Sequence, residues 1–132
     1  MQLMLRAAGP ADPDLVWQRY LRPALWSQFS PQIRRVDCAD PELRVGSRGR
    51  VHGPPPGVAV DFLVSEVDVE ARTRTWAWQV RVLLLGVRLH LRHGVLDARP
   101  GTSTWLLVSG PAPVVLAYAP LARWALGRLV RR

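Results

Sequence analysis

Two neighbouring stretches of the chain alternate between an apolar and a polar side, and this alternation constrains the fold more than any other feature. The apolar side carries Trp76, Trp78, Val80 and Val82 in residues 73–84, and Val87, Leu89, Leu91, His93 and Val95 in residues 87–97. Successive side chains of a β-strand point to opposite faces, so each stretch predicts a strand with one buried face. Gly86 lies between the stretches and predicts a short turn, which favours antiparallel pairing.

Further strands are expected on both sides of this pair. Their predicted ranges are residues 2–8, 33–36, 48–52, 58–64 and 102–109. In the strand that begins at Val58, the apolar residues Val58, Val60, Phe62 and Val64 share one face, but after Ser65 they shift to Val67 and Val69. A change of parity within a strand predicts a β-bulge or a strong bend near Ser65.

Helices are expected near both ends of the chain. Asp12 followed by Pro13 predicts a helix start, and the helix should run through Tyr20 to a stop at Pro23. A second short helix or turn is expected over residues 24–29. The last helix should span residues 112–130, with its inward stripe formed by Val114, Tyr118, Leu121, Ala122, Ala125 and Leu129. Pro120 should kink this helix or divide it.

Composition narrows the functional classes. The length of 132 residues suits a single domain over residues 1–132. All 18 residues counted as Lys or Arg are arginine, which gives a net charge of +8. These arginines are dispersed along the chain, whereas a nucleic-acid-binding protein more often clusters them among exposed aromatic residues, so no nucleic-acid partner is expected.

Cysteine usage and hydropathy bear on the compartment. Cys38 is the only cysteine, so no internal disulfide can form and a reducing cytoplasm is the expected location. The first nine residues lack the basic and apolar regions of a secretory signal. The most apolar stretch, residues 105–122, is interrupted by Gly110, Pro111, Pro113 and Pro120, so no transmembrane segment is expected.

Several short motifs are spaced along the chain. Residues 26–33 have the pattern W-x-x-F-x-P-x-I, and residues 46–49 have G-x-x-G. Residues 62–68 have F-x-V-x-x-V-D, and residues 74–78 have R-x-W-x-W. In residues 92–95 a histidine precedes an apolar strand position. With these motifs the chain resembles the START-like superfamily, also called SRPBCC, and its polyketide cyclase/dehydrase branch. The resemblance covers nearly the whole chain and rests mainly on framework residues.

The resemblance implies an α+β helix-grip fold. In that fold a curved antiparallel sheet of about seven strands surrounds a long C-terminal helix, two short helices follow the first strand, and a cavity lies between sheet and helix. Members of the superfamily bind lipids, sterols, polyketides or other apolar molecules, and some catalyse cyclisation or dehydration. A small apolar molecule is therefore the expected partner of this chain, and no cofactor is expected.

The candidate ligand-binding residues are those expected on the inward faces of the sheet and helices: Trp26, Val60, Phe62, Trp76, Trp78, Leu91, His93 and Tyr118. The alternative is that they only pack the core. His93 is the candidate catalytic residue, as a general acid or base. Its alternative is a buried histidine that hydrogen-bonds to Tyr118, a tryptophan or the backbone. His90 and His93 should face opposite sides of one strand, so no metal site is predicted.

Three functions remain open from the sequence. The first is the binding of a small apolar ligand, lipid-like or polyketide-like, in the cavity. The second is a polyketide cyclase or dehydratase that uses His93. The third is a module without a cavity, whose Arg-rich last helix contacts a membrane surface or a partner chain through Leu116 and Trp124. A second copy of the chain, in a homodimer, is one such partner.

Overall fold

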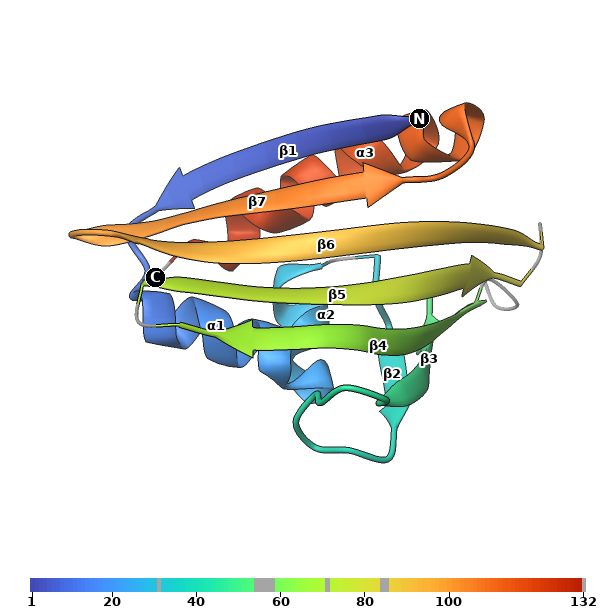
Figure 1. Ribbon diagram of the computed structural model, residues 1–132, viewed down its shortest axis with the longest axis horizontal. Coiled ribbons are helices and arrows are strands. Elements are labelled where there is room, and N and C mark those ends of the chain that lie inside the picture. Colours follow the sequence, from blue (N-terminus) through green and yellow to red (C-terminus); the bar gives the residue numbers. More distant parts are fainter. Residues whose placement is uncertain (31, 54–58, 71, 84–85, 132) are drawn as a thin grey trace.

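The computed structural model describes residues 1–30, 32–53, 59–70, 72–83 and 86–131. Its main element is one antiparallel sheet of seven strands in the order β1-β7-β6-β5-β4-β3-β2 (Figure 1). The first strand pairs with the last, and from there each strand pairs with the one that precedes it in the sequence. The strands are β1 (Gln2–Gly9), β2 (Arg35–Cys38), β3 (Arg48–His52), β4 (Ala59–Val69), β5 (Thr73–Val82), β6 (Val87–Ala98) and β7 (Gly101–Ser109).

Helices lie on one face of this sheet (Figure 1). They are α1 (Pro13–Leu21), the 3-10 turn η1 (Pro23–Leu25), α2 (Trp26–Phe29) and α3 (Ala112–Leu129). The long helix α3 packs against β1 and β7, and α1 packs against β6. The predicted fold class is confirmed: an α+β helix-grip fold, with two short helices after the first strand and a long helix at the end.

The change of parity in β4 is a real irregularity of the sheet. Val64 pairs with Trp78 and Glu66 pairs with Ala77, so the register shifts across Ser65. As a result Val67 lies opposite Trp76 and returns to the inner side of the sheet. A bulge of this kind increases the local bend of the strand, which suits a sheet that curves around helices.

Strand β2 begins two residues later than predicted. The amide of Ile33 donates to the carbonyl oxygen of Ser30 at 2.9 Å, so Ile33 belongs to a turn, and the strand spans Arg35–Cys38 rather than residues 33–36. The apolar residue Ile33 therefore occupies a turn and not the predicted strand. Two predicted strand residues, Val58 and Leu84, lie outside the described residues.

The predicted inward stripe of α3 is partly wrong. Ala122, Ala125 and Leu129 are buried as predicted, but Leu121 is 40% exposed, and the buried set also includes Val115 and Leu126. The helix is rotated because its main neighbour is β1, at the edge of the sheet, together with α2. Pro120 does not divide α3, which is continuous from Ala112 to Leu129.

The segment between β1 and α1, together with α1, holds the C-terminal end of α3 in place. The amide of Ala11 donates to the carbonyl oxygen of Val130 at 3.0 Å. Arg19 of α1 donates from its guanidinium to the carbonyl oxygens of Leu129 and Arg131, the latter at 2.6 Å. Asp12 caps the start of α1, since its carboxylate accepts from the amide of Asp14 at 2.8 Å, which confirms the predicted helix start.

Candidate functional site

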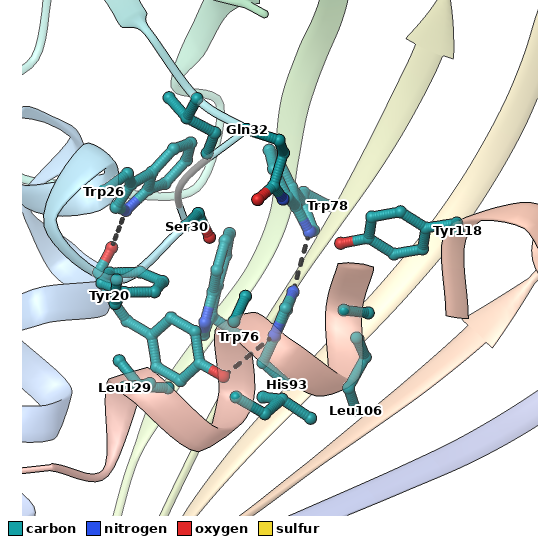
Figure 2. A pocket seen from close by; sticks show the side chains of 15 residues that line it. Tyr20, Trp26, Ser30, Gln32, Trp76, Trp78, His93, Leu106, Tyr118 and Leu129 are labelled. Carbon is teal, nitrogen blue, oxygen red and sulfur yellow. Dashed lines mark hydrogen bonds between the residues drawn. The ribbon is translucent and has the colours of Figure 1, made fainter. Parts of the chain in front are cut away.

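A small chamber lies between the inner face of the sheet and the helices. Its volume is about 60 Å³. Figure 2 shows the side chains that surround it, which come from α1, α2, the segment after α2, the central strands and α3. Its walls are formed by Tyr20, Trp26, Phe29, Ser30, Gln32, Ile33, Trp76, Trp78, His93, Leu106, Tyr118, Ala122, Ala125, Leu126 and Leu129. We call this space the inner chamber.

Aromatic rings form one continuous wall of the inner chamber. The ring centroids of Trp76 and Trp78 are 5.1 Å apart, and Trp26 lies 5.9 Å from Trp76 and 5.2 Å from Trp78. The two strand tryptophans share a face because they are two residues apart in β5. Aromatic rings at these separations attract one another in tilted and edge-to-face arrangements, so the three indoles form one packed wall.

A larger and more open space adjoins the inner chamber. It has a volume of about 230 Å³ and is lined by Gln32, Ile33, Val51, Gly53, Ala59, Val60, Trp78, Val80, Leu89, Leu91, Tyr118 and Leu121. Nearly all of these side chains are apolar. Four of them, Gln32, Ile33, Trp78 and Tyr118, also line the inner chamber, so the two spaces are neighbours. We call the larger space the outer groove.

His93 is held by three aromatic neighbours at the wall of the inner chamber. The indole N–H of Trp78 donates to His93 Nε2 at 3.0 Å. On the other side of the ring, His93 Nδ1 lies 3.2 Å from the hydroxyl oxygen of Tyr20. The imidazole also stacks on Trp76, with centroids 4.5 Å apart and an interplanar angle of 9°. Both ring nitrogens are therefore engaged by hydrogen-bond partners.

The protonation of His93 follows from these contacts. An indole N–H can only donate, so Nε2 must accept and the proton of the neutral ring sits on Nδ1. Burial lowers the pKa of His93 from 6.5 to about 3, because the charged ring would lose its hydration. At neutral pH the ring is uncharged, and its Nδ1–H donates to Tyr20.

Both tyrosines of the inner chamber keep their protons. Burial raises the pKa of Tyr20 well above its usual value of 10.0, and Tyr118 adds to this effect. Burial also raises the pKa of Tyr118 to about 12. Each hydroxyl is therefore neutral at physiological pH and can donate one hydrogen bond.

Two buried polar atoms of the inner chamber have no hydrogen-bond partner among the described residues. They are the indole Nε1 of Trp76 and the side-chain oxygen Oε1 of Gln32. The other two tryptophans of the chamber differ in this respect, since the N–H of Trp26 donates to the carbonyl oxygen of Tyr20 at 2.8 Å and that of Trp78 donates to His93. Buried polar groups usually find a partner, so the two unpartnered atoms mark a place for polar contact.

Most of the predicted ligand-binding residues come together in these two spaces. Trp26, Trp76, Trp78, His93 and Tyr118 line the inner chamber, while Val60 and Leu91 line the outer groove. Phe62 lines neither. It packs beneath the wall, with its ring 5.5 Å from that of Trp26 and 5.3 Å from that of Trp78.

Sequence reasoning missed several lining residues. Tyr20 was assigned to a helix but not to the site, although its spacing from Trp17 places both on the buried side of α1. Gln32 gave no signal at all, because it lies in an irregular segment without periodicity. Leu126 was missed because the helix is rotated relative to the predicted stripe.

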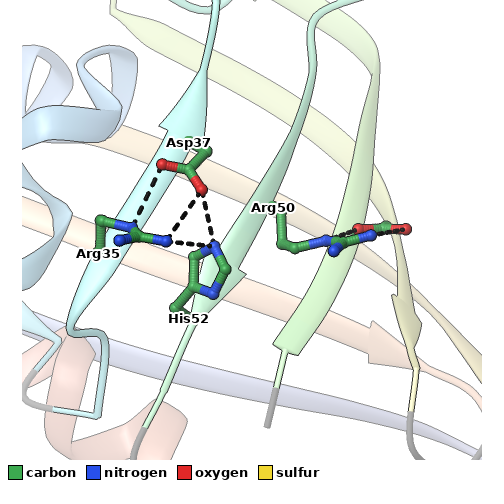
Figure 3. Close-up of polar contacts among 5 residues, drawn as sticks. Arg35, Asp37, Arg50 and His52 are labelled. Atoms are coloured by element: carbon green, nitrogen blue, oxygen red, sulfur yellow. Dashed lines mark hydrogen bonds and ion pairs between the residues drawn. The ribbon is translucent and has the colours of Figure 1, made fainter. Parts of the chain in front are cut away.

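Two charged clusters on the strands β2, β3 and β4 lie outside the two spaces. His52 pairs with Asp37 at 2.8 Å, and Arg35 contacts the same carboxylate (Figure 3). The hydrogen bond from His52 is the main reason that the pKa of Asp37 falls below its usual value. Asp61 pairs with Arg50 at 2.7 Å on the outer face of the sheet, which likewise lowers the pKa of Asp61. Among the described residues, no three His, Cys, Asp or Glu side chains are grouped to hold a metal ion.

No family model matches the sequence, and no curated protein matches it either. Solved structures do match its fold. A hypothetical protein of Helicobacter pylori has a TM-score of 0.79 at 14% identity, and the match covers 98% of this chain and 84% of that protein. Ara h 8.0201 has a TM-score of 0.77 at 12% identity, with coverage of 98% and 94%.

A third similar structure is BexL, a di-domain ARO/CYC protein from the BE-7585A biosynthetic pathway. Its TM-score is 0.74 at 17% identity, and the match covers 98% of this chain but 45% of BexL. Together these structures show that the chain has the helix-grip fold that its resemblance to START-like, or SRPBCC, proteins implied. In the part of the chain that the structure describes, no helix combines the length and apolar character that a bilayer crossing requires.

Proposed function

We propose that this protein binds a small apolar molecule, lipid-like or polyketide-like, between its sheet and α3. The observation that carries the proposal is the adjacency of two differently built spaces, an apolar outer groove of about 230 Å³ and an inner chamber with unpartnered polar atoms. Apolar walls supply affinity by removing ligand surface from water, and a few polar groups supply orientation. Residues 1–132 would act as one domain, and we expect it in the cytoplasm.

The sizes of the two spaces indicate how a ligand would divide between them. Pockets for drug-sized ligands measure roughly 300–1,000 Å³. The inner chamber, at about 60 Å³, can take only a small group. The body of the ligand would therefore lie in the outer groove, against Val60 and Leu91, with one end directed past Tyr118 into the chamber.

The experiment uses α-methylstyrene as a small neutral probe of the outer groove. Binding to the full chain is followed by amide chemical shifts in NMR. Val60→Phe adds bulk within the groove and should weaken binding at least fivefold, a change of about 1 kcal/mol. The control is Val69→Phe, because Val69 is an exposed residue of the same strand, 62% accessible to solvent. Equal binding by both variants would contradict the location, and no binding by the unchanged protein would refute the proposal.

A catalytic role for His93 remains a prediction. The likeness to BexL concerns the fold, and the geometry of His93 supports a positioning role more than acid–base chemistry. Its pKa of about 3 makes it a weak base, and its two nitrogens are taken by Trp78 and Tyr20. The surface-module function rests on the exposed side chains of Leu116 and Trp124 on α3, which are 56% and 53% accessible.

A further inference from the structure

We propose that the inner chamber recognises a carbonyl oxygen, held by two donors, the hydroxyl of Tyr20 and the indole N–H of Trp76. The bound molecule would thus be a neutral ketone, aldehyde or ester with an apolar body. This inference rests on the proposed function, since it specifies the ligand that the outer groove and the chamber would hold together.

The hydrogen bonds around His93 each have a defined direction. The N–H of Trp78 supplies the proton in its contact with Nε2, and the Nδ1–H of His93 supplies the proton in its contact with Tyr20. The Tyr20 oxygen therefore accepts from His93. Its own O–H proton is left to point elsewhere, and no described residue accepts it in a hydrogen bond. The chain of contacts turns Tyr20 into a donor at the chamber wall.

Trp76 supplies the second donor. Its side chain is 2% exposed, it lines the inner chamber, and its N–H finds no acceptor among the described residues. Leaving a buried donor unpaired is costly, so an acceptor inside the chamber would be stabilised by it. The rings of Tyr20 and Trp76 have centroids 5.5 Å apart, and both lie against His93 (Figure 2). Two donors thus come from neighbouring rings of one wall.

The described lining of the inner chamber is uncharged. None of the described arginine side chains lines the inner chamber, and its two tyrosines and His93 are neutral at physiological pH. An anionic group such as a carboxylate would lose its hydration there without gaining a countercharge. A carbonyl oxygen is uncharged and accepts up to two hydrogen bonds, which matches two neutral donors.

The test compares two probes of nearly the same shape, acetophenone and α-methylstyrene, which differ in having C=O or C=CH₂. The full chain should bind acetophenone about tenfold more tightly, since two hydrogen bonds distinguish the probes. In NMR spectra of protein labelled with ¹⁵N at the indole nitrogens, the Trp76 N–H resonance should move downfield when acetophenone is added. It should not move when α-methylstyrene is added. This comparison needs no variant, so it does not depend on whether a substitution is tolerated.

A variant then assigns the second donor. Tyr20→Phe removes the hydroxyl and should reduce the preference for acetophenone over α-methylstyrene about fivefold. Retained binding of the alkene also shows that the variant is folded.

The outcomes separate the inference from the proposed function. If both probes bind with equal affinity and the Trp76 resonance does not respond to the ketone, the carbonyl inference is overturned and the apolar site stands. That result is expected if a water molecule stays hydrogen-bonded to the Tyr20 hydroxyl and the Trp76 N–H when the ketone binds. If neither probe binds, the proposed function fails and the inference fails with it.

Discussion

His93 illustrates how neighbours determine the chemistry of a single residue. In the sequence it is one polar residue in an otherwise apolar strand face, and a histidine there could serve catalysis or structure. The structure surrounds it with Trp76, Trp78 and Tyr20, which hold it uncharged and fix which nitrogen carries the proton. The residue thereby positions the Tyr20 hydroxyl. Its effect on the site is indirect, through the proton that it donates.

Protein stability should fall in mild acid because of His93. The folded protein keeps this ring neutral down to about pH 3, whereas the unfolded chain takes up the proton near 6.5. Because the unfolded state binds more protons between these values, the free energy of unfolding decreases as pH falls. The expected loss is about 2 kcal/mol between pH 7 and pH 5.

Urea denaturation at a series of pH values measures this loss. His93→Gln should remove most of the dependence over that range. The matched control is His90→Gln, because His90 is an exposed residue of the same strand and the variant should retain the loss. A wild-type stability that stays flat from pH 7 to pH 5 would show that His93 is not held neutral.

At the scale of elements, the attachment of α3 positions the site. The helix supplies Tyr118, Ala122, Ala125, Leu126 and Leu129 to the inner chamber, so its rotation and height decide the chamber's shape. Its C-terminal end is tied to α1 by Arg19 and to the segment before α1 by Ala11. A cation at a helix C-terminus also interacts favourably with the unpaired carbonyl groups there.

Arg19→Met should destabilise the protein by about 1–2 kcal/mol, because it removes two charge-assisted hydrogen bonds to the end of α3 and keeps the aliphatic bulk. Thermal unfolding followed by circular dichroism provides the measurement. Arg22→Met is the control. Arg22 follows the last residue of α1, and the described partners of its guanidinium are Gln18 and Glu42 on the surface, so less than about 1 kcal/mol is expected. Equal losses from both variants would argue against the role of Arg19.

At the scale of the whole molecule, the curved sheet and the helices enclose less space than a pocket for a large ligand requires. Four of the six tryptophans, Trp17, Trp26, Trp76 and Trp78, are buried, and three of these line the inner chamber. The molecule is thus closely packed around a small inner chamber that shares lining residues with the outer groove. This arrangement favours a ligand of which only one end enters the interior.

Filling the inner chamber should remove its selectivity without unfolding the protein. Ala125 is buried on α3 and lines the chamber, so Ala125→Val adds two methyl groups there. We expect the preference for acetophenone over α-methylstyrene to disappear, while the free energy of unfolding changes by less than about 1.5 kcal/mol. Ala117→Val, on the exposed side of α3, has the same helix-propensity cost and should keep the preference. A preference that survives in Ala125→Val would place the carbonyl elsewhere.

The sequence by itself determined most of the strands, the antiparallel pairing of successive strands and the faces that they bury. Alternation in β5 and β6, the parity change at Ser65 and the Asp12 cap are local properties, and each was found where it was predicted. The same reasoning placed Trp76, Trp78 and His93 on one face. It was wrong about the turn at Ile33 and the exposure of Leu121, because these depend on what the segment packs against.

Only the tertiary structure decided the site. The contact between His93 and Tyr20 joins residues 73 positions apart, and no periodicity relates them. The volume of the chamber depends on how side chains from α1, α2, β5, β6, β7 and α3 interlock, which is a property of the assembled molecule. Patterns along a chain report which side of an element is buried, whereas a cavity is what remains after all the elements have packed together.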